Sequence, residues 1–259
     1  MSTKIFDAYA AYYDMIYRDK DYIGESRYVE KALKRRGVDG PRLLELGCGT
    51  GRHAVCLARA GYRIHGIDLS TLMVQQANAQ MPKDLADRLV FEQGDVRSAR
   101  LPGHLGSFDA VIALFHVASY QTSTEDIVGM FRTAAEHLKP GGVFLFDFWH
   151  GPGVLSDPPS VRVKRMNEAD LAMLRTAEPV VRSCDNVVEV HYDIVVHNIA
   201  EESWHRFSEL HEMRYLFIPE LSLLLRQAGF CEPQYTAWMG REAPGLGDWT
   251  AMATALREG

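Results

Sequence analysis

The sequence predicts a doubly wound α/β fold with a seven-stranded, mostly parallel sheet and an antiparallel β insertion after the fifth strand. Short apolar runs alternate with helical patterns, which is typical of a parallel sheet covered by helices. Closely spaced glycines follow the first apolar run, at the kind of sheet edge where ligands bind. From 161 to 217 the pattern changes to a period of two, which indicates antiparallel hairpins.

The length of 259 residues fits one main domain. We expect an N-terminal lid and a ligand-binding core over 1–160, and an antiparallel insertion over the active site at 161–217. Residues 218–259 would then complete the core sheet.

The opening segment has mixed helical spacing and more aromatic residues than an exposed helix needs. We expect it to pack as a lid, and the alternative is a helix that only covers the core. The residues concerned are Phe6, Tyr9, Tyr12, Tyr13, Ile16 and Tyr17.

The first strand ends in the loop Glu45-Leu46-Gly47-Cys48-Gly49-Thr50-Gly51, and a helical pattern begins at Arg52. Glycine tolerates the tight turn and lets backbone N–H groups approach a ligand closely. The second strand ends at Asp68, 21 residues beyond Gly47. A ribose-binding acid is expected at about 20 residues from such a loop.

The charge beside this loop discriminates between two kinds of nucleotide-like ligand. The dinucleotide motif is G-x-G-x-x-G, whereas this loop is G-x-G-x-G with Arg52 in the sixth place. Glu45, two residues before Gly47, would repel a pyrophosphate and attract an ammonium or a sulfonium group. The loop therefore favours a cofactor with a positively charged tail.

The later elements follow the same alternation. A helix over 71–81 is capped by Ser70, and glycines after Pro140 stop a helix over 125–138. Asp185-Asn186 marks a turn inside the insertion. The other predicted elements are strands at 89–92, 110–114, 143–148, 234–239 and 249–256, and a helix at 219–228 that ends before Gly229.

Four blocks of the sequence resemble the class I S-adenosylmethionine-dependent methyltransferases in order and spacing. They are the glycine loop, which matches E/D-x-G-x-G-x-G, then Asp68-Leu69-Ser70, Gly94-Asp95-Val96 and the run 108–113. The resemblance implies a Rossmann-like fold, S-adenosylmethionine as cofactor and methyltransferase activity.

The resemblance also implies roles for particular residues. Glu45 would lie near the cofactor's amino group, and Gly47 and Gly49 would line its methionine and ribose. Asp68 would accept hydrogen bonds from the ribose hydroxyls. Asp95 would face the adenine amine, with Val96 donating its backbone N–H. Tyr13-Asp14 and Lys20-Asp21-Tyr22 are similar to two short segments that close over the cofactor in amino-sugar methyltransferases. The remaining implied contacts are Tyr13, Tyr22, Cys48, Leu69, Met73 and Leu114.

Methyl transfer to an alcohol needs a base, and histidine suits that role. His116 and Tyr120 follow the fourth strand, and His150 ends the fifth at the same edge, so these three are the candidate catalytic residues. The alternatives are structural: a backbone hydrogen bond for His116, a loop cap for His150, and a brace on the glycine loop for Asp147. We expect His191, His197, His205 and His211 on a solvent-exposed face of the insertion.

We expect the acceptor to be a small polar metabolite such as a sugar or sugar nucleotide, methylated on nitrogen or oxygen. The alternatives are an NAD-linked oxidoreductase and a non-catalytic S-adenosylmethionine-binding protein. Exposed insertion edges suggest a homodimer through that segment. The four cysteines have no zinc-like spacing, so we expect no metal.

Composition disfavours two classes of partner. A net charge of −6 gives no long-range attraction for nucleic acid. No stretch is long and apolar enough for a membrane helix, and the N-terminus has no signal pattern, so we expect a cytoplasmic protein.

Overall fold

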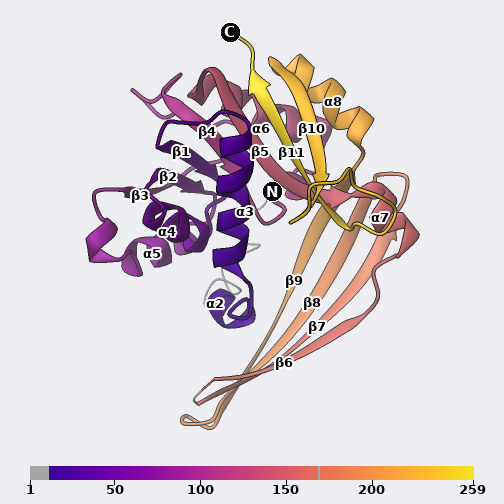
Figure 1. Ribbon diagram of the computed structural model, residues 1–259. Helices are drawn as coiled ribbons and strands as arrows, with labels where there is room; N and C mark the ends of the chain where they lie inside the picture. The colour runs from indigo at the N-terminus through magenta and orange to yellow at the C-terminus, as the bar shows by residue number, and fades with distance from the viewer. Residues whose placement is uncertain (1–11, 169) are drawn as a thin grey trace.

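A computed structural model describes residues 12–168 and 170–259 of the chain (Figure 1). Phe6 and Tyr9, which belong to the predicted lid, lie outside the described residues.

The core is a sheet in which five parallel strands run in the order β3-β2-β1-β4-β5. β11 pairs antiparallel with β5, and β10 pairs antiparallel with β11, so the final pair is a hairpin as predicted. The α/β fold is confirmed. The seven core strands are β1 (Arg42–Leu46), β2 (Arg63–Asp68), β3 (Leu89–Gln93), β4 (Phe108–Ala113), β5 (Leu138–His150), β10 (Phe230–Ala237) and β11 (Thr250–Arg257).

The sheet is larger than predicted because the insertion joins it. The end of β9 pairs with the end of β5, at Trp149 with Tyr215 and His150 with Leu216, and the continuous sheet has eleven strands. The insertion consists of four antiparallel strands: β6 (Arg162–Glu168), β7 (Leu171–Arg182), β8 (Val187–Asn198) and β9 (Ser203–Leu216).

The strand predicted at 234–239 lies at Phe230–Ala237, and the predicted start of β5 is wrong as well. The helix before β5 ends at His137, and Pro140-Gly141-Gly142 lies inside β5 instead of in a separate stop. The pairing of β4 with β5 shifts register between Phe108 and Ala110, and Gly141 has a φ of +73°. A local irregularity therefore lets the strand begin earlier than its apolar run.

Helices cover both faces of the core sheet. Apolar side chains of α3, α4 and α5 form one buried cluster with β1 and β2, and those of α6 and α8 form another on the opposite face. The serine caps explain where two of these helices begin: Ser70 Oγ accepts from Met73 N, as predicted, and Ser123 Oγ accepts from Asp126 N. The helices are α2 (Tyr13–Ile16), α3 (Tyr22–Arg35), α4 (Arg52–Arg59), α5 (Thr71–Ala79), α6 (Thr124–His137), α7 (Gly151–Ser156) and α8 (Ile218–Gln227), with short 3-10 turns η1 (Lys83–Leu85) and η2 (Val117–Tyr120).

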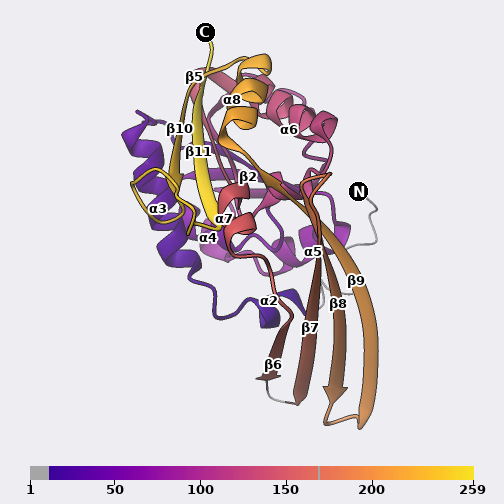
Figure 2. The same cartoon turned by 90° about the vertical axis from the view of Figure 1, so that its right-hand side faces the viewer.

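The insertion is a long twisted ribbon that runs away from the core and passes α2 (Figures 1 and 2). Its apolar face packs on that helix, where Met15 and Ile16 meet Met166, Met173 and Ile194. The turn predicted at Asp185-Asn186 joins β7 to β8, with Asn186 at a φ of 56°. Because β9 returns to the end of β5, the base of the ribbon stands beside the carboxyl ends of the parallel strands.

Candidate active site

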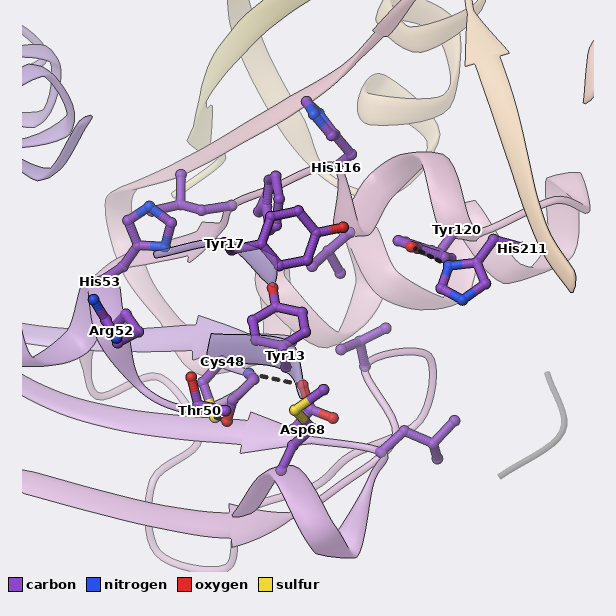
Figure 3. A pocket seen from close by; sticks show the side chains of 18 of the residues that line it. Tyr13, Tyr17, Cys48, Thr50, Arg52, His53, Asp68, His116, Tyr120 and His211 are labelled. Carbon is purple, nitrogen blue, oxygen red and sulfur yellow. Dashed lines mark hydrogen bonds between the residues drawn. The ribbon is translucent and has the colours of Figure 1, made fainter. Parts of the chain in front are cut away.

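A cavity of about 250 Å³ lies at the carboxyl ends of the parallel strands (Figure 3). The glycine loop, Asp68 and Asp95 line one part of it, and η2 lines another. Tyr13 and Tyr17 come from α2 and the segment after it, and Tyr192, His211 and Met213 come from the insertion. The cavity is thus bounded by the core, the N-terminal segment and the insertion together.

The glycine loop is fixed against β2 by its backbone. The N–H groups of Gly47 and Cys48 both donate to the Ile67 carbonyl, at 2.8 and 2.9 Å. Gly47 has a φ of +72°, and a Cβ on it would lie 2.5 Å from Cγ2 of Val117. Only glycine fits this close approach between the loop and η2.

Asp68 is held in place by two backbone donors. Its Oδ2 accepts from Gly49 N at 2.8 Å and its Oδ1 from Ser70 N at 2.9 Å. Burial raises the pKa of Asp68, and the two backbone hydrogen bonds oppose that rise. A carboxylate has about four acceptor positions, so Asp68 can also accept hydroxyl groups from a ligand in the cavity.

Glu45 lies behind the loop and does not line the cavity. Its side chain is 1% exposed, and Oε2 has no hydrogen-bond partner among the residues the structure describes. Burial and, to a lesser extent, the charge of Asp68 raise its pKa to about 8. An acid in this state would become a carboxylate if a cation came near it.

Asp95 is already paired inside the protein. Arg97 donates to it from Nε to Oδ1 at 2.8 Å and from Nη2 to Oδ2 at 2.6 Å, which lowers the pKa of Asp95. Arg97 also donates to Asp126 at 3.1 Å. Sequence reasoning missed Arg97, although its position two residues after Asp95 suits such a fork.

Ion pairs tie the N-terminal segment to the glycine loop. Asp14 accepts from Thr50 Oγ1 at 3.0 Å and lies 3.7 Å from Arg52. His53 Nε2 lies 2.8 Å from Glu25, which also pairs with Lys20. Tyr13 and Tyr22 both line the cavity, as do Arg52 and His53, which sequence reasoning missed.

His116 is fixed by Asp147, which is fully buried. His116 N lies 3.1 Å from both carboxylate oxygens, and the ring Nδ1 lies 2.7 Å from Oδ2 without the alignment of a hydrogen bond. Phe115 and His116 both have φ near +65°, at 64° and 66°. Such strain persists only where the surroundings enforce it, so Asp147 braces this turn and not the glycine loop.

Tyr120 belongs to a hydrogen-bonded chain that sequence reasoning missed. Its Oη lies 2.9 Å from His211 Nδ1 (Figure 3). His211 Nε2 lies 2.9 Å from Glu209 Oε2. The prediction that His211 is solvent-exposed is wrong, because at the base of the ribbon this face of β9 meets η2. His191 and His205, farther from the core, are exposed as expected.

His150 does not lie in the cavity, contrary to its selection as a catalytic candidate. Its buried ring lies with Nδ1 3.1 Å from the Asp248 carbonyl, to which it can only donate. The side chain therefore ties the end of β5 to the loop before β11. The preceding residue, Trp149, lines the cavity instead.

Most of the candidate residues do meet at the cavity. Those that line it are Tyr13, Tyr22, Gly47, Cys48, Gly49, Asp68, Leu69, Met73, Asp95, Val96, Leu114, His116 and Tyr120. Burial raises the pKa of the Cys48 thiol, which disfavours a nucleophilic role.

Two negative findings apply to the described residues only. Within 12–168 and 170–259, no group of three or more His, Cys, Asp or Glu side chains is arranged to hold a metal ion. No helix in that part of the chain is long and apolar enough to cross a membrane.

The donors and acceptors fit an adenosyl cofactor with a charged amino-acid tail. Asp68 offers acceptors for ribose, and Val96 lines the cavity beside Asp95. Gly49 has a φ of +53°, and apart from its chain neighbours no described residue comes within 4 Å of the place a Cβ would take. The orphaned Oε2 of Glu45 suits an ammonium group nearby.

Known proteins share this sequence and fold. Residues 43–142 match the family described as a methyltransferase domain. YqeM of Bacillus subtilis (strain 168), named as an unproven methyltransferase, is 28% identical over 233 residues, which cover 90% of this chain and 89% of that protein. The dTDP-3-amino-3,4,6-trideoxy-alpha-D-glucopyranose N,N-dimethyltransferase of Streptomyces venezuelae is 31% identical over 151 residues, 58% of this chain and 60% of that one.

The fold has a close counterpart among solved structures. An S-adenosylmethionine-dependent methyltransferase from Clostridium acetobutylicum ATCC 824 superposes with a TM-score of 0.79 at 19% identity, over 98% of this chain and 99% of that one.

Proposed function

We propose that this chain, a class I S-adenosylmethionine-dependent methyltransferase similar to those of the amino-sugar type, methylates a nitrogen or oxygen of a small polar metabolite such as a sugar or sugar nucleotide. The observation that carries the proposal is the single cavity in which the residues suited to the cofactor adjoin a set of aromatic and histidine side chains. The name of the Streptomyces venezuelae relative, which is a sugar N,N-dimethyltransferase, supports a sugar acceptor.

The part of the cavity away from the glycine loop suits such an acceptor. Aromatic rings of Tyr17, Phe115 and Trp149 offer apolar faces, and Tyr120, His116 and His211 offer polar atoms. Small-molecule sites commonly combine an apolar lining with a few polar groups that fix orientation.

We propose that S-adenosylmethionine is held by Asp68 at the ribose, by the backbone of Gly47 and Gly49, and by Asp95 and Val96 at the adenine. Tyr13, Tyr22, Cys48, Leu69, Met73 and Leu114 would complete the contacts, and Glu45 would balance the charge of the amino group from behind the loop. When bound, the cofactor supplies an electrophilic methyl group on a positively charged sulfur.

The protein itself orients the acceptor, removes water from the reacting groups and provides a group that takes the acceptor's proton. Closure by the N-terminal segment and the ribbon excludes water and aligns the acceptor, which can supply several kcal/mol of the barrier, about 7–11 in favourable cases. His116, braced by Asp147, is proposed to orient the acceptor through its ring.

The first test is turnover with a defined acceptor panel. Purified protein and S-adenosylmethionine are incubated with amino sugars, neutral sugars and their nucleotide forms, and with thiol and carbon acceptors that lack a free amine or hydroxyl. S-adenosylhomocysteine is measured by mass spectrometry. We expect product only with acceptors that carry a free amine or hydroxyl. Turnover confined to thiol or carbon acceptors would contradict the proposed acceptor class.

We also propose that the chain forms a homodimer through the insertion. Among the residues that the structure describes, β6 pairs only with β7, and Val163 of β6 and Val161 just before it are exposed. Unprotected edges of this kind tend to pair with another chain. Light scattering should give twice the chain mass for the wild type and the chain mass for Val163→Lys. A monomeric wild type at all concentrations would refute the proposal.

Two further expectations from composition belong with this proposal, namely a cytoplasmic location and no binding of nucleic acid. Cell fractionation and a gel-shift titration at low salt test them. Protein in the membrane fraction, or a salt-sensitive shift, would count against them.

A further inference from the structure

We propose that Tyr120, His211 and Glu209 form a proton-accepting chain that takes the proton of the methyl acceptor. This inference rests on the proposed function and deepens it by assigning a destination for the proton. Tyr120 comes from η2 of the core, whereas His211 and Glu209 come from β9 of the insertion. The chain therefore exists only when the base of the ribbon is docked on the core.

The geometry of the chain fixes which nitrogen of His211 carries the proton. Nε2 lies 2.9 Å from the Glu209 carboxylate, which can only accept when ionised, so Nε2 is the N–H group. Nδ1 is then the acceptor, and Tyr120 donates its hydroxyl proton to it across 2.9 Å. The three groups point in one direction, from the cavity toward Glu209.

The burial of the chain supports a relay. The side chains of His211 and Glu209 are 3% and 6% exposed, and both Tyr120 and His211 line the cavity. Bulk water therefore has poor access to the imidazole, whereas a ligand in the cavity reaches Tyr120. A carboxylate beside a histidine stabilises the imidazolium form that a relay creates.

Tyr120 is not a standing phenolate. Burial raises its pKa well above the usual value, and the phenols of Tyr17 from the segment after α2 and Tyr192 from β8 raise it further, as does Glu209. Arg175 of β7, which lies 5.0 Å from the Tyr192 ring, acts in the opposite direction. Tyr120 can therefore accept a proton only while it passes its own proton to His211.

The acceptor's nitrogen or oxygen forms a bond to the methyl carbon as the carbon–sulfur bond breaks and its electron pair stays on sulfur. The acceptor's proton passes to Oη of Tyr120, and the proton of Tyr120 passes to Nδ1 of His211. The products are a methylated acceptor, a neutral thioether and an imidazolium ion paired with Glu209. The proton later leaves to solvent when the cavity opens.

The first arm of the test is ¹⁵N NMR of histidine-labelled full-length protein with S-adenosylhomocysteine at pH 8, and His211→Asn identifies the resonances. We expect the neutral His211 ring to be protonated on Nε2, with Nδ1 unprotonated. A ring protonated on Nδ1 would point its proton at Tyr120 and would overturn the proposal.

The second arm compares variants in methyl transfer, with the acceptor that gives the most product in the panel. We expect Tyr120→Phe to lower kcat by about 100-fold, the scale of a lost general base, while the Kd for S-adenosylhomocysteine stays unchanged. Glu209→Gln should lower kcat less and shift the pH profile of kcat. Tyr235→Phe is the matched control, because it removes a phenol that bonds Ser222 outside the cavity, and its kcat should equal that of the wild type.

The outcomes separate the two proposals. If Tyr120→Phe keeps full kcat, or if His116→Ala alone removes the pH dependence, the chain is not the proton acceptor. If the panel yields no product but His211 has the expected tautomer, the acceptor class fails while the hydrogen-bonded arrangement that the relay needs stands. A Tyr120→Phe variant with unchanged melting temperature excludes misfolding as the cause of any loss.

Discussion

Glu45 is a residue whose physical state departs far from its ordinary one. It is buried, its Oε2 lacks a partner among the described residues, and its pKa is raised to about 8. The prediction that an acid lies next to the glycine loop is correct. The burial of its carboxyl behind the loop could not be predicted from the sequence, because this burial depends on how β1 packs against its neighbours.

This pKa gives a pH prediction for stability without cofactor. The folded protein holds a proton on Glu45 between the ordinary value of 4.5 and about 8, where the unfolded chain has released it. The contribution of this bound proton to the free energy of unfolding is therefore complete below pH 4.5 and is lost as the pH rises through 8. Between pH 6 and 9 we expect the wild type to lose about 2–3 kcal/mol of unfolding free energy relative to Glu45→Gln.

Urea unfolding at several pH values measures that difference. The Gln variant provides the control, since it keeps the shape of the side chain without a titrating group. S-adenosylhomocysteine should reduce the difference, because its ammonium group favours the carboxylate. Parallel stability curves for the two proteins would show that Glu45 ionises normally.

Residues whose roles depend on local spacing were predictable, whereas those whose roles depend on tertiary contacts were not. Asp68 and the glycines were found because their spacing is local and tied to backbone geometry. His211 was assigned to a solvent-exposed face because a period of two shows which residues share a face but not what covers it. His150 was selected for its place after β5, although its side chain turns toward the Asp248 carbonyl.

At the scale of elements, helix starts were the most predictable features because capping is local. Ser70 was identified as a cap from sequence, and Ser123 performs the same task for α6, with Oγ accepting from Asp126 N at 3.0 Å. Strand starts were less predictable. β5 begins at Leu138 because a register shift accommodates Pro140 and Gly141, which no propensity rule anticipates.

The cap of α6 gives a stability prediction. Ser123→Ala should lower the free energy of unfolding by about 1 kcal/mol, since one backbone N–H loses its acceptor. For a chain of this size, that corresponds to a melting temperature lower by about 2–4 °C. Calorimetry measures the change, and Ser98→Ala, at an exposed serine, is the control. Equal melting temperatures for the two variants would mean that the cap does not stabilise α6.

At the scale of the whole molecule, the cavity joins three parts of the chain that are far apart in sequence. Its lining residues come from α2 (Tyr13–Ile16), from the carboxyl ends of the parallel strands and from the base of the ribbon. Local patterns predicted the core sheet and the existence of the insertion. The meeting of Tyr120 with His211, 91 residues apart, follows only from the pairing of β9 with β5.

The central claim is that this cavity binds the cofactor with Asp68 at its ribose. Calorimetric titration with S-adenosylhomocysteine of the wild type, Asp68→Ala and the control Asp193→Ala tests it most directly. We predict saturable binding by the wild type, a loss of about 1.5–3 kcal/mol for Asp68→Ala, and no change for the control. Equal affinity in all three proteins, or no binding by the wild type, would contradict it.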